Sequence, residues 1–515
     1  MALIYGRVVV FYSAYFDFRT TCNLKSKSIY SQPLLNGSMA ASCTAVAKYE
    51  QLVEQIRQQI ESEIWLPGEK LPSLREQVRL SGMSLMTVMH AYQVLESQGL
   101  IQSRPQSGYF VAPHAEFLSQ PLSHQKVQLA EAVDINAFIF DVLQACRDPR
   151  IVPFGSAFPD PELFPQRQMM RALTHVSHSM KAVDALHNLP PGNEALRKTL
   201  AQRYALQGVQ VAPDDIVITN GALEALNLSL QVLTEPGDWV AIENPSFYGA
   251  LQAIERLKLK SVAIATDPQT GIDLEELKRA LERWPIKALW MMTNQQNPVG
   301  CTLSREKKQQ LVALLTQHGV TLIEDDVYSE LYFGSEKPLP AKAFDPDDTV
   351  LHCSSFSKNL VAGFRVGWVA AGKHAQRIQR LQLMSTLSTS APMQQALATY
   401  LGTGSYDRHL RRLRQVLEQR KNLARQALKK YLPAGARIND SRGGYFLWIE
   451  LPKQIDTTAL CYSALRHDIS IAPGKMFSSS EQYANYFRFN TAWWSESQEA
   501  AVATLGRLIA EWHQG

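Results

Sequence analysis

The stretch VLHCSSFSK, from Val350 to Lys358, followed after a short gap by Arg365, decides how the rest of the chain is interpreted. Its apolar first half predicts a strand, and hydroxyl groups, a lysine and an arginine follow where that strand ends. Hydroxyl groups and a guanidinium suit a phosphate, because the planar guanidinium matches the phosphate oxygens. A lysine among them can form a Schiff base with an aldehyde. Pyridoxal phosphate carries both groups on one ring. The simpler alternative is a polar loop with a solvated lysine, and this stretch alone favours that alternative.

Length and composition indicate a globular protein with more than one domain. The chain has 515 residues, of which 45% are hydrophobic and 19% charged, and its formal net charge is +4. Bulk charge therefore does not indicate a nucleic-acid partner, and any basic surface must be local. The six cysteines are scattered, with no Cys-x-x-Cys pair and no Cys/His spacing that suits a metal. This pattern predicts a reduced, cytoplasmic protein without a metal site.

Residues 1–47 differ from the rest of the chain. The apolar segment from Val8 to Phe16 is too short to span a bilayer, and no clear cleavage site follows it. The small and polar residues that come next are typical of disorder. We predict that 1–47 is a disordered or misassigned extension and that the natural chain begins near Met39.

Residues 48–112 predict a small domain of three helices and a hairpin. Ser73 is the expected N-cap of the second helix, with Glu76 completing a capping box, and Ser84 is the expected start of the third. The predicted elements are a helix over 48–63, helices that open near residues 73 and 84, and strands over 100–104 and 108–111. Such a set forms a winged helix-turn-helix, in which the third helix enters the major groove of DNA.

This domain resembles the winged-helix domain of the GntR regulator family in the sequence PGEKLPSLREQVRLSGMSLMTVMHAYQVLESQGLIQSRPQSGYFV, residues 67–111. The resemblance implies double-stranded DNA, an operator, as a partner. The DNA-facing positions that it implies are Arg75, Ser84, Thr87, His90, Arg104 and Gly108, with arginines at phosphates or base edges and hydroxyls at phosphates. The family usually has an arginine where this chain has Leu85, so one contact and its specificity are in question. A winged helix that binds protein is the alternative.

Residues 113–132 predict a linker, and the chain from 133 onward alternates strands with helices. Near-continuous apolar strands predict an α/β fold, with a mostly parallel sheet covered by helices on both faces. The apolar runs are 216–218, 239–242, 262–264, 288–292, 321–323, 350–353 and 366–369. A smaller C-terminal α+β domain is predicted over about 410–515. A long basic helix over 407–431 leads into it, and we interpret the basic residues of this helix as a solvated face rather than as a second DNA-binding site, which is the alternative.

Ligands of such sheets bind beyond the carboxyl ends of the strands. In this chain polar residues follow one predicted strand after another. They are Thr219 to Gly221, Glu243 to Phe247, Asn294 to Gly300, Asp325 to Tyr328, and Ser355 to Lys358. The sequence therefore predicts a polar ligand site at one edge of the sheet.

From about 133 to 515 the chain resembles the fold-type I pyridoxal-phosphate aminotransferases, on the ordered set Asn-Pro-x-Gly (297–300), Asp-x-x-Tyr (325–328), Ser-x-Ser-Lys (355–358) and an arginine. The resemblance implies that Lys358 is the catalytic residue and binds the cofactor through a Schiff base. Asp325 would pair with the pyridine nitrogen and keep it protonated, so that the ring acts as an electron sink. Arg488 would bind the carboxylate of a substrate or effector. The other implied cofactor contacts are Asn297 and Tyr328 at the ring oxygen, Phe247 stacked on the ring, Ser355, Ser357 and Arg365 at the phosphate, and the backbone of Gly221, Ala222 and Leu223 at a helix N-terminus.

Each of these residues also has a simpler structural interpretation. These are a strand-end cap for Asp325, a turn residue for Asn297, a core residue for Phe247 and a surface ion pair for Arg488. Their joint occurrence in this order favours the cofactor site. Two features depart from the family. The helix start at 221–223 lacks the usual hydroxyl or amide side chains, and His187 stands where the family often has a tyrosine that reaches the cofactor phosphate of the partner subunit.

A GntR-type winged helix joined to an aminotransferase-like domain is the layout of the MocR subfamily of bacterial regulators, which this chain resembles over about 48–515. The segment FGSAFPDPELFP (154–165) also resembles the start of the second domain in that family. The resemblance implies a head-to-tail homodimer that regulates transcription, without a membrane partner. Pyridoxal phosphate, or its adduct with an amino acid or amine effector, would set the affinity for DNA. The alternatives are a working aminotransferase with an accessory DNA-binding domain, and a sensor of the cofactor itself.

Overall fold

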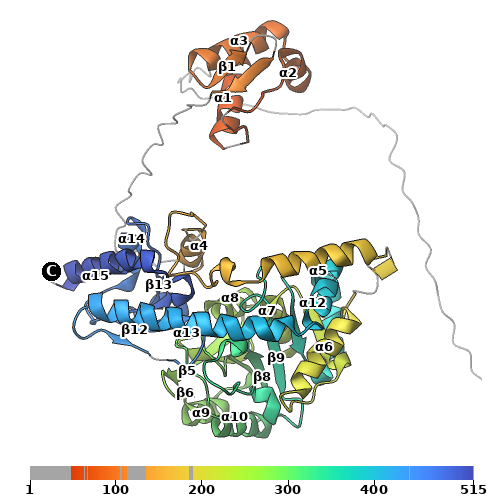
Figure 1. The fold of residues 1–515 in the computed structure, drawn as a ribbon, viewed down its shortest axis with the longest axis vertical. Helices are drawn as coiled ribbons and strands as arrows, with labels where there is room; N and C mark the ends of the chain where they lie inside the picture. Colours follow the sequence, from red (N-terminus) through yellow and green to blue (C-terminus); the bar gives the residue numbers. More distant parts are fainter. Residues whose placement is uncertain are drawn as a thin grey trace, which may run out of the picture. The chain divides into compact units, whose positions relative to one another are not determined.

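The computed structural model describes residues 48–62, 64–66, 68–104, 107–112, 135–145, 147–181, 183–184, 189–439, 441–478 and 480–513. These residues fall into two compact units, one before residue 131 and one after it (Figure 1). The predictions for 1–47, for 113–132 and for His187 lie outside the described residues. Within the described part of the chain, no helix has both the length and the apolar character that crossing a membrane requires.

The first unit contains the helices and the hairpin that the sequence predicts. Helices α1 (Lys48–Glu61), α2 (Leu74–Ser81) and α3 (Leu85–Ser97) precede the antiparallel strands β1 (Ile101–Arg104) and β2 (Gly108–Val111). Ser73 and Ser84 cap α2 and α3, because their side chains accept hydrogen bonds from the backbone amides of Glu76 and Thr87. The apolar faces of α1 and α3 pack together in the core of the unit. This core includes Leu52, Ile56, Ile60, Val88, Ala91, Tyr92 and Leu95.

The second unit is built on an eight-stranded sheet in the order β3-β10-β9-β8-β7-β4-β5-β6. Its strands are β3 (Ile216–Thr219), β4 (Trp239–Asn244), β5 (Lys260–Asp267), β6 (Gly271–Ile272), β7 (Ile286–Met291), β8 (Thr321–Asp325), β9 (Val350–Ser355) and β10 (Gly367–Ala370). The five strands from β9 to β5 pair in parallel, whereas β10 is antiparallel to both of its neighbours. Only residues 356–366 join β9 to β10, which is too short a connection for a parallel crossover.

Helices cover both faces of this sheet, which explains why its strands are apolar almost throughout. Helices α7 (Ala222–Leu233) and α8 (Tyr248–Arg256) pack in one core, and α9 (Leu274–Arg283) and α10 (Arg305–Gln317) pack in another. Along β7, Ala288 and Trp290 belong to the first core, and Leu289 and Met291 belong to the second. The predicted fold class is therefore confirmed. The remaining helices near this sheet are α5 (Gln166–Ser179), α6 (Glu194–Ala205), α11 (Ala375–Ser385) and α12 (Ala391–Leu401).

A smaller antiparallel sheet, in the order β11-β12-β14-β13, forms the other end of the second unit. It consists of β11 (Arg437–Ile438), β12 (Phe446–Glu450), β13 (Ala472–Pro473) and β14 (Tyr486–Asn490). It packs with α4 (Ile135–Ala145), α14 (Thr457–Leu465) and α15 (Glu499–His513). The long helix α13 (Ser405–Tyr431) runs along the unit between the two sheets (Figure 1).

The basic residues of α13 form a solvated face only in part, because Arg411 and Arg412 are exposed whereas Lys421 and Arg420 make internal contacts. Lys421 is buried, and its Nζ donates to Ser441 Oγ at 2.6 Å and to Gly443 O at 2.7 Å. Arg420 forms an ion pair with Asp160 at 2.9 Å. The sequence pattern could not distinguish these internal contacts from a solvated stripe, because both require cations on one side of a helix.

Candidate functional site

Lys358 follows β9 and lies in a partly buried position among backbone and aromatic groups. Its Nζ donates to Ala157 O at 2.9 Å and lies 3.7 Å from the centre of the Phe158 ring. Burial lowers the pKa of Lys358 to about 7, and the positive charges of Arg488 and Arg365 act in the same direction. At neutral pH a large fraction of this amine is uncharged and able to act as a nucleophile.

Asp325 ends β8 and is fully buried. Among the described residues its Oδ1 atom has no hydrogen-bond partner, and burial raises the pKa of its carboxyl to about 7. A buried carboxylate oxygen without a partner is rare in folded proteins and calls for an explanation. A protonated ring nitrogen is the kind of group that would satisfy it.

Tyr328 is buried near Asp325, with Tyr445 and Phe446 around its ring at centroid distances of 5.7 Å and 5.5 Å. Burial raises the pKa of Tyr328, and the charge of Asp325 adds to this effect while Arg488 opposes it. The phenol therefore stays protonated at neutral pH and can donate a hydrogen bond.

The side chains predicted at a phosphate lie together at the N-terminus of α7. Arg365 donates to Ser357 Oγ at 3.4 Å and to Asn220 O at 3.2 Å, and Ser355 Oγ accepts from the Ser357 amide at 3.4 Å. Gly221 directly precedes α7 with φ +86°, and a Cβ atom at this position would lie 2.7 Å from Arg365 Nη2. The guanidinium, two hydroxyl groups and the first helix amides, those of Ala222 and Leu223, form a cradle that suits an anion.

Arg488 lies in the middle of β14 and is buried. It donates to Asn297 Oδ1 and to Gly155 O, both at 2.8 Å, and its guanidinium lies 4.2 Å from the centre of the Phe446 ring. Asn297 and Arg488, which are far apart in the sequence, are thus in direct contact. A buried arginine held on one side by an amide oxygen is well placed to bind a carboxylate on the other.

Phe247 precedes α8 and contacts Tyr248 at a ring distance of 4.7 Å. It is partly buried rather than a full core residue. Its stacking on a cofactor ring stays a prediction.

The segment from Phe154 to Phe158 belongs to the site, although the sequence analysis assigned it no role there. Gly155 O accepts from Arg488, Ala157 O accepts from Lys358, and Tyr445 Oη donates to the same Ala157 O at 3.0 Å. The sequence FGSAFPDPELFP carries a family resemblance, but nothing in it indicates that its carbonyl groups accept hydrogen bonds from Lys358 and Arg488. Backbone partners of this kind leave no mark on the sequence.

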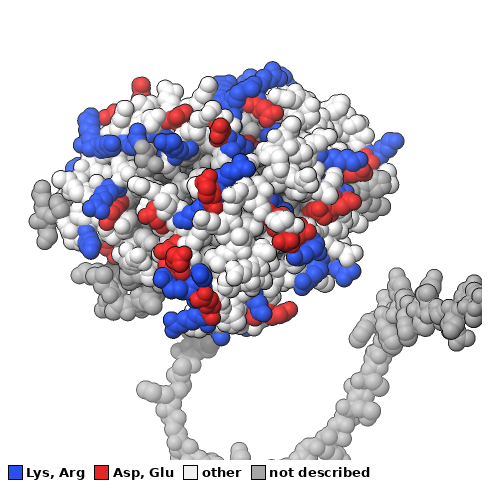
Figure 2. Space-filling model, turned by 90° about the horizontal axis from the view of Figure 1, so that it is seen from below, with Lys and Arg blue, Asp and Glu red and all other residues white. Residues whose placement is uncertain are grey.

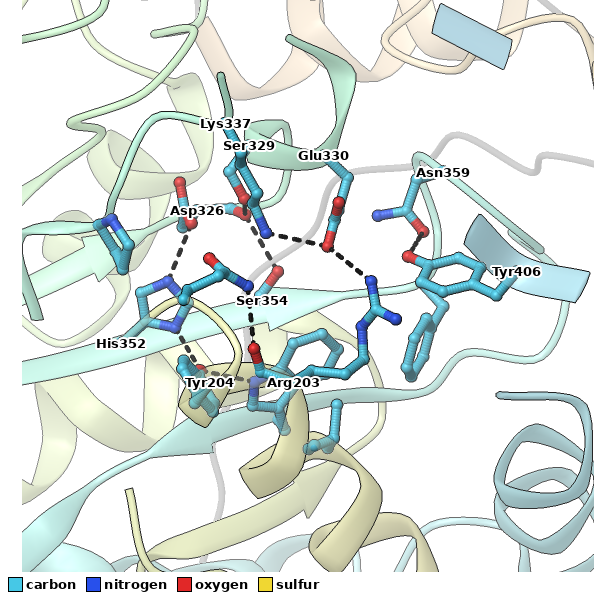
Figure 3. Close-up of a pocket in the computed structure, with 15 residues that line it drawn as sticks. Arg203, Tyr204, Asp326, Ser329, Glu330, Lys337, His352, Ser354, Asn359 and Tyr406 are labelled. Atoms are coloured by element: carbon cyan, nitrogen blue, oxygen red, sulfur yellow. Dashed lines mark hydrogen bonds and ion pairs between the residues drawn. The ribbon is translucent and has the colours of Figure 1, made fainter. Parts of the chain in front are cut away.

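A cavity of about 40 Å³ is lined by Asp326, the residue that follows Asp325 (Figure 3). Asp326 accepts a hydrogen bond from His352 Nε2 at 2.9 Å, and Tyr204 Oη lies 2.6 Å from His352 Nδ1 (Figure 3). Asn294 Nδ2 also donates to Asp326, at 2.9 Å. Trp368 Nε1 donates to the same Tyr204 oxygen at 2.9 Å. Asp326 lines this cavity, whereas its neighbour Asp325 does not. The sequence analysis missed this network, because its members come from five separate segments.

In the first unit, Arg75 on α2 and Arg104 at the end of β1 are exposed. Arg104 lies over the Phe110 ring at 4.3 Å, and the His90 ring contacts the Tyr49 ring at 4.4 Å. Gly108 opens β2 with φ +102°. Ser84 and Thr87 lie at the N-terminus of α3, with their hydroxyl oxygens 2.8 Å apart. On the face of the second unit seen in Figure 2, acidic and basic side chains are interspersed. The contacts of these winged-helix residues with DNA stay predictions.

Comparisons with known proteins agree with both units. Residues 163–504 match the family described as aminotransferase class I and II, and residues 48–111 match the bacterial regulatory proteins of the gntR family. The HTH-type transcriptional regulator YdcR of Escherichia coli (strain K12) is 64% identical over 466 residues, which cover 90% of this chain and 99% of YdcR. A second regulator of that organism, YjiR, is 35% identical over the same shares.

Solved structures resemble the second unit. A multiple substrate aminotransferase from Thermococcus profundus matches with a TM-score of 0.68 and 25% identity, over 76% of this chain and 98% of its own. The α-aminoadipate aminotransferase LysN from Thermus thermophilus, solved with N-(5'-phosphopyridoxyl)-L-leucine, matches with a TM-score of 0.66 and 28% identity, over 72% and 95%. Fold and site thus define a unit of the aminotransferase class, which is joined to a winged helix. Members of this aminotransferase family generally use pyridoxal phosphate. The chain belongs to the GntR-family transcriptional regulators of the MocR type.

Proposed function

We propose that this regulator binds operator DNA through its winged helix and holds pyridoxal phosphate covalently at Lys358, in the cytoplasm. The observation that carries the cofactor proposal is the buried Asp325 oxygen without a partner among the described residues, beside an amine whose pKa is lowered to about 7. A buried carboxylate without a partner lowers the stability of the cofactor-free protein. A cationic ring nitrogen that paired with it would remove this cost, and the free energy gained would contribute to binding.

Different residues of the site would bind different parts of pyridoxal phosphate. Arg365, Ser355 and Ser357 bind the phosphate at the α7 N-terminus, while Tyr328 and Asn297 orient the ring oxygen. When bound, the cofactor supplies an aldehyde that captures amines and a ring that accepts electrons. Asp325 keeps its carboxylate at the ring nitrogen. Lys358 gives up its proton readily because burial and two neighbouring arginines lower its pKa.

An amino acid is the effector class that this site favours. Arg488 is buried, already fixed by Asn297 and Gly155, and faces two aromatic rings, Phe446 and Phe477. Its planar guanidinium can pair with an α-carboxylate in two parallel hydrogen bonds. The effector would change DNA binding only as far as it favours one arrangement of the protein over another.

We further propose a head-to-tail homodimer. Leu223, in the first turn of α7 at the phosphate cradle, is an exposed apolar side chain, and so are Leu383, Met384 and Leu387 in and after α11. The two helices are joined by the contact between Thr386 and Glu224. A patch of this kind at a site rim favours cover by another chain. Two winged helices would then read two half-sites.

The test is a visible absorption spectrum of the purified full-length protein after incubation with pyridoxal phosphate, alongside the variant Lys358→Ala. We expect a protein-bound absorption band in the wild type and its loss in the variant. The same samples are then titrated with a panel of amino acids while DNA affinity is followed by fluorescence anisotropy on labelled promoter fragments. An unchanged spectrum of wild-type protein with the cofactor would refute the proposed site.

A second candidate function is transamination, because the site keeps the lysine, the aspartate and the arginine that such chemistry needs. An assay of keto acid formation separates the two. If one amino acid shifts the spectrum and no keto acid forms, the result supports effector sensing. Steady keto acid formation supports a working aminotransferase.

A further inference from the structure

The recognition helix α3 begins with two exposed apolar side chains. Leu85 is 50% exposed and Met86 is 68% exposed, directly after the capping residue Ser84. The first turn of α3 carries no acidic residue, and the whole helix from 85 to 97 contains no lysine or arginine. Two adjacent exposed apolar side chains at the start of a helix form a small apolar surface, and a partner that covers it gains the free energy of burying it.

The polar groups around these side chains indicate what that partner is. Arg75 and Arg104, both exposed, provide positive charge on α2 and on the hairpin, as a phosphate backbone requires. The Ser84 and Thr87 hydroxyls lie 2.8 Å apart at the same helix end. Residues 48–111 also match the gntR family of bacterial regulatory proteins. The surface around Leu85 and Met86 therefore suits double-stranded DNA.

In the major groove, bases offer only one apolar group, which is the C5-methyl group of thymine. An α3 without arginine, lysine or asparagine cannot form the bidentate contacts that select guanine, and only Gln93 could select adenine in that way. We propose that Leu85 and Met86 recognise thymine methyl groups, so that the operator half-site carries thymine where these side chains enter the groove. This inference rests on the proposed function, because it requires α3 to bind DNA.

The experiment uses the full-length protein and DNA that it selects from a library of random duplexes. Each thymine of the selected half-site is replaced in turn by deoxyuridine, which removes the methyl group and keeps every hydrogen-bonding group. Affinity is measured by fluorescence anisotropy at one fixed salt concentration. We expect one or two positions in each half-site at which deoxyuridine weakens binding about fourfold, the change that corresponds to one buried methyl-sized group.

The double variant Leu85→Ala/Met86→Ala should bind thymine and deoxyuridine equally at those positions. Ile64→Ala is the matched control, since Ile64 is 62% exposed but lies outside α3. This control should show the same ratio of affinities for the thymine and deoxyuridine duplexes as the wild type. In the variant Leu85→Arg, the slope of log affinity against log salt concentration should become steeper by about one, because the new arginine adds one contact with the DNA and releases about one more counterion.

Two results would overturn the inference. One is an affinity that no deoxyuridine replacement changes by more than about 1.5-fold, well below the effect of a buried methyl group. The other is an unchanged thymine preference in the double variant, with circular dichroism showing that it is folded. If the protein selects no duplex at all, DNA binding itself fails and the inference fails with it, which distinguishes that case from the first two.

Discussion

Asp325, the last residue of β8, and its neighbour Asp326 should affect stability in opposite directions. Asp325 is buried with one oxygen unpartnered among the described residues, and Asp326 accepts hydrogen bonds from His352 and Asn294. The variants Asp325→Asn and Asp326→Asn each replace a carboxylate by an amide of similar size. In protein free of cofactor, we expect Asp325→Asn to be more stable than the wild type at pH 8 and Asp326→Asn to be less stable.

The magnitude for Asp325 follows from its pKa. Burial raises this pKa from 3.8 to about 7, and each pKa unit corresponds to about 1.4 kcal/mol. Between these two values the folded state binds more protons than the unfolded state, so stability falls as pH rises through this window. Above pH 7 the carboxylate costs the folded state about 4 kcal/mol. The buried amide of Asp325→Asn retains some desolvation cost, which leaves a gain of about 2 kcal/mol at pH 8.

Replacing Asp326 should change the stability in the opposite direction. Burial acts to raise the pKa of Asp326, but the hydrogen bond and the charge of His352 outweigh it, so the pKa is lowered. The stability that this carboxylate contributes is present above its ordinary pKa and is lost as pH falls through the lowered value. Removing one partner of a buried pair typically costs about 3 kcal/mol. Asp326→Asn should lose about that much at pH 8.

The assay is urea denaturation of the cofactor-free protein at pH 5 and pH 8. The advantage of Asp325→Asn over the wild type should grow by about 2 to 3 kcal/mol between these pH values, whatever the cost of the amide. Saturating pyridoxal phosphate should reverse the order, because the wild-type carboxylate then gains a cationic partner. A wild type that is as stable as Asp325→Asn at pH 8, or a gain that is the same at pH 5, would refute the reasoning.

Three further variants test other parts of the site. Gly221→Ala places a Cβ atom 2.7 Å from Arg365 Nη2 at φ +86°, so the affinity for pyridoxal phosphate should fall at least about tenfold in a spectral titration. Arg488→Lys keeps the charge but not the planar fork, so spectral titrations should show weaker binding of amino acids and unchanged binding of amines without a carboxylate. Tyr204→Phe leaves His352 Nδ1 without its 2.6 Å partner and should lower the free energy of unfolding by about 1 to 3 kcal/mol in urea denaturation.

Much of the fold could be predicted because local signals agree with the architecture. The apolar run predicted over 321–323 lies within β8, and Ser84 caps α3 as expected. Apolar runs with helices between them dictate a covered, mostly parallel sheet. The order of the strands could not be predicted, since β10 pairs with β3, which lies far from it in the sequence. Pairing of distant strands depends on tertiary contacts that no local pattern records.

The candidate site could be predicted in its residue types but not in its partners. Lys358, Asp325 and Arg488 carry chemistry that a cofactor needs, and their spacing resembles a known family. The acceptor for Arg488 is the carbonyl oxygen of Gly155, and the acceptor for Lys358 is that of Ala157. Every residue except proline offers the same backbone groups, so a carbonyl partner is visible only in three dimensions.

The doublets Asp325-Asp326 and Ser354-Ser355 explain how an unpartnered carboxylate can persist. Successive residues of a strand point to opposite faces, so one member of each doublet lies with the cofactor residues and the other lines the cavity of Figure 3. Ser354 Oγ donates to Asp326 O at 3.0 Å, and the Asp326 amide donates to Cys353 O at 2.9 Å. The side chain of Asp326 is also held by His352, so the backbone next to Asp325 is fixed by three contacts. The buried network therefore preserves the unsatisfied oxygen that a cationic ligand can use.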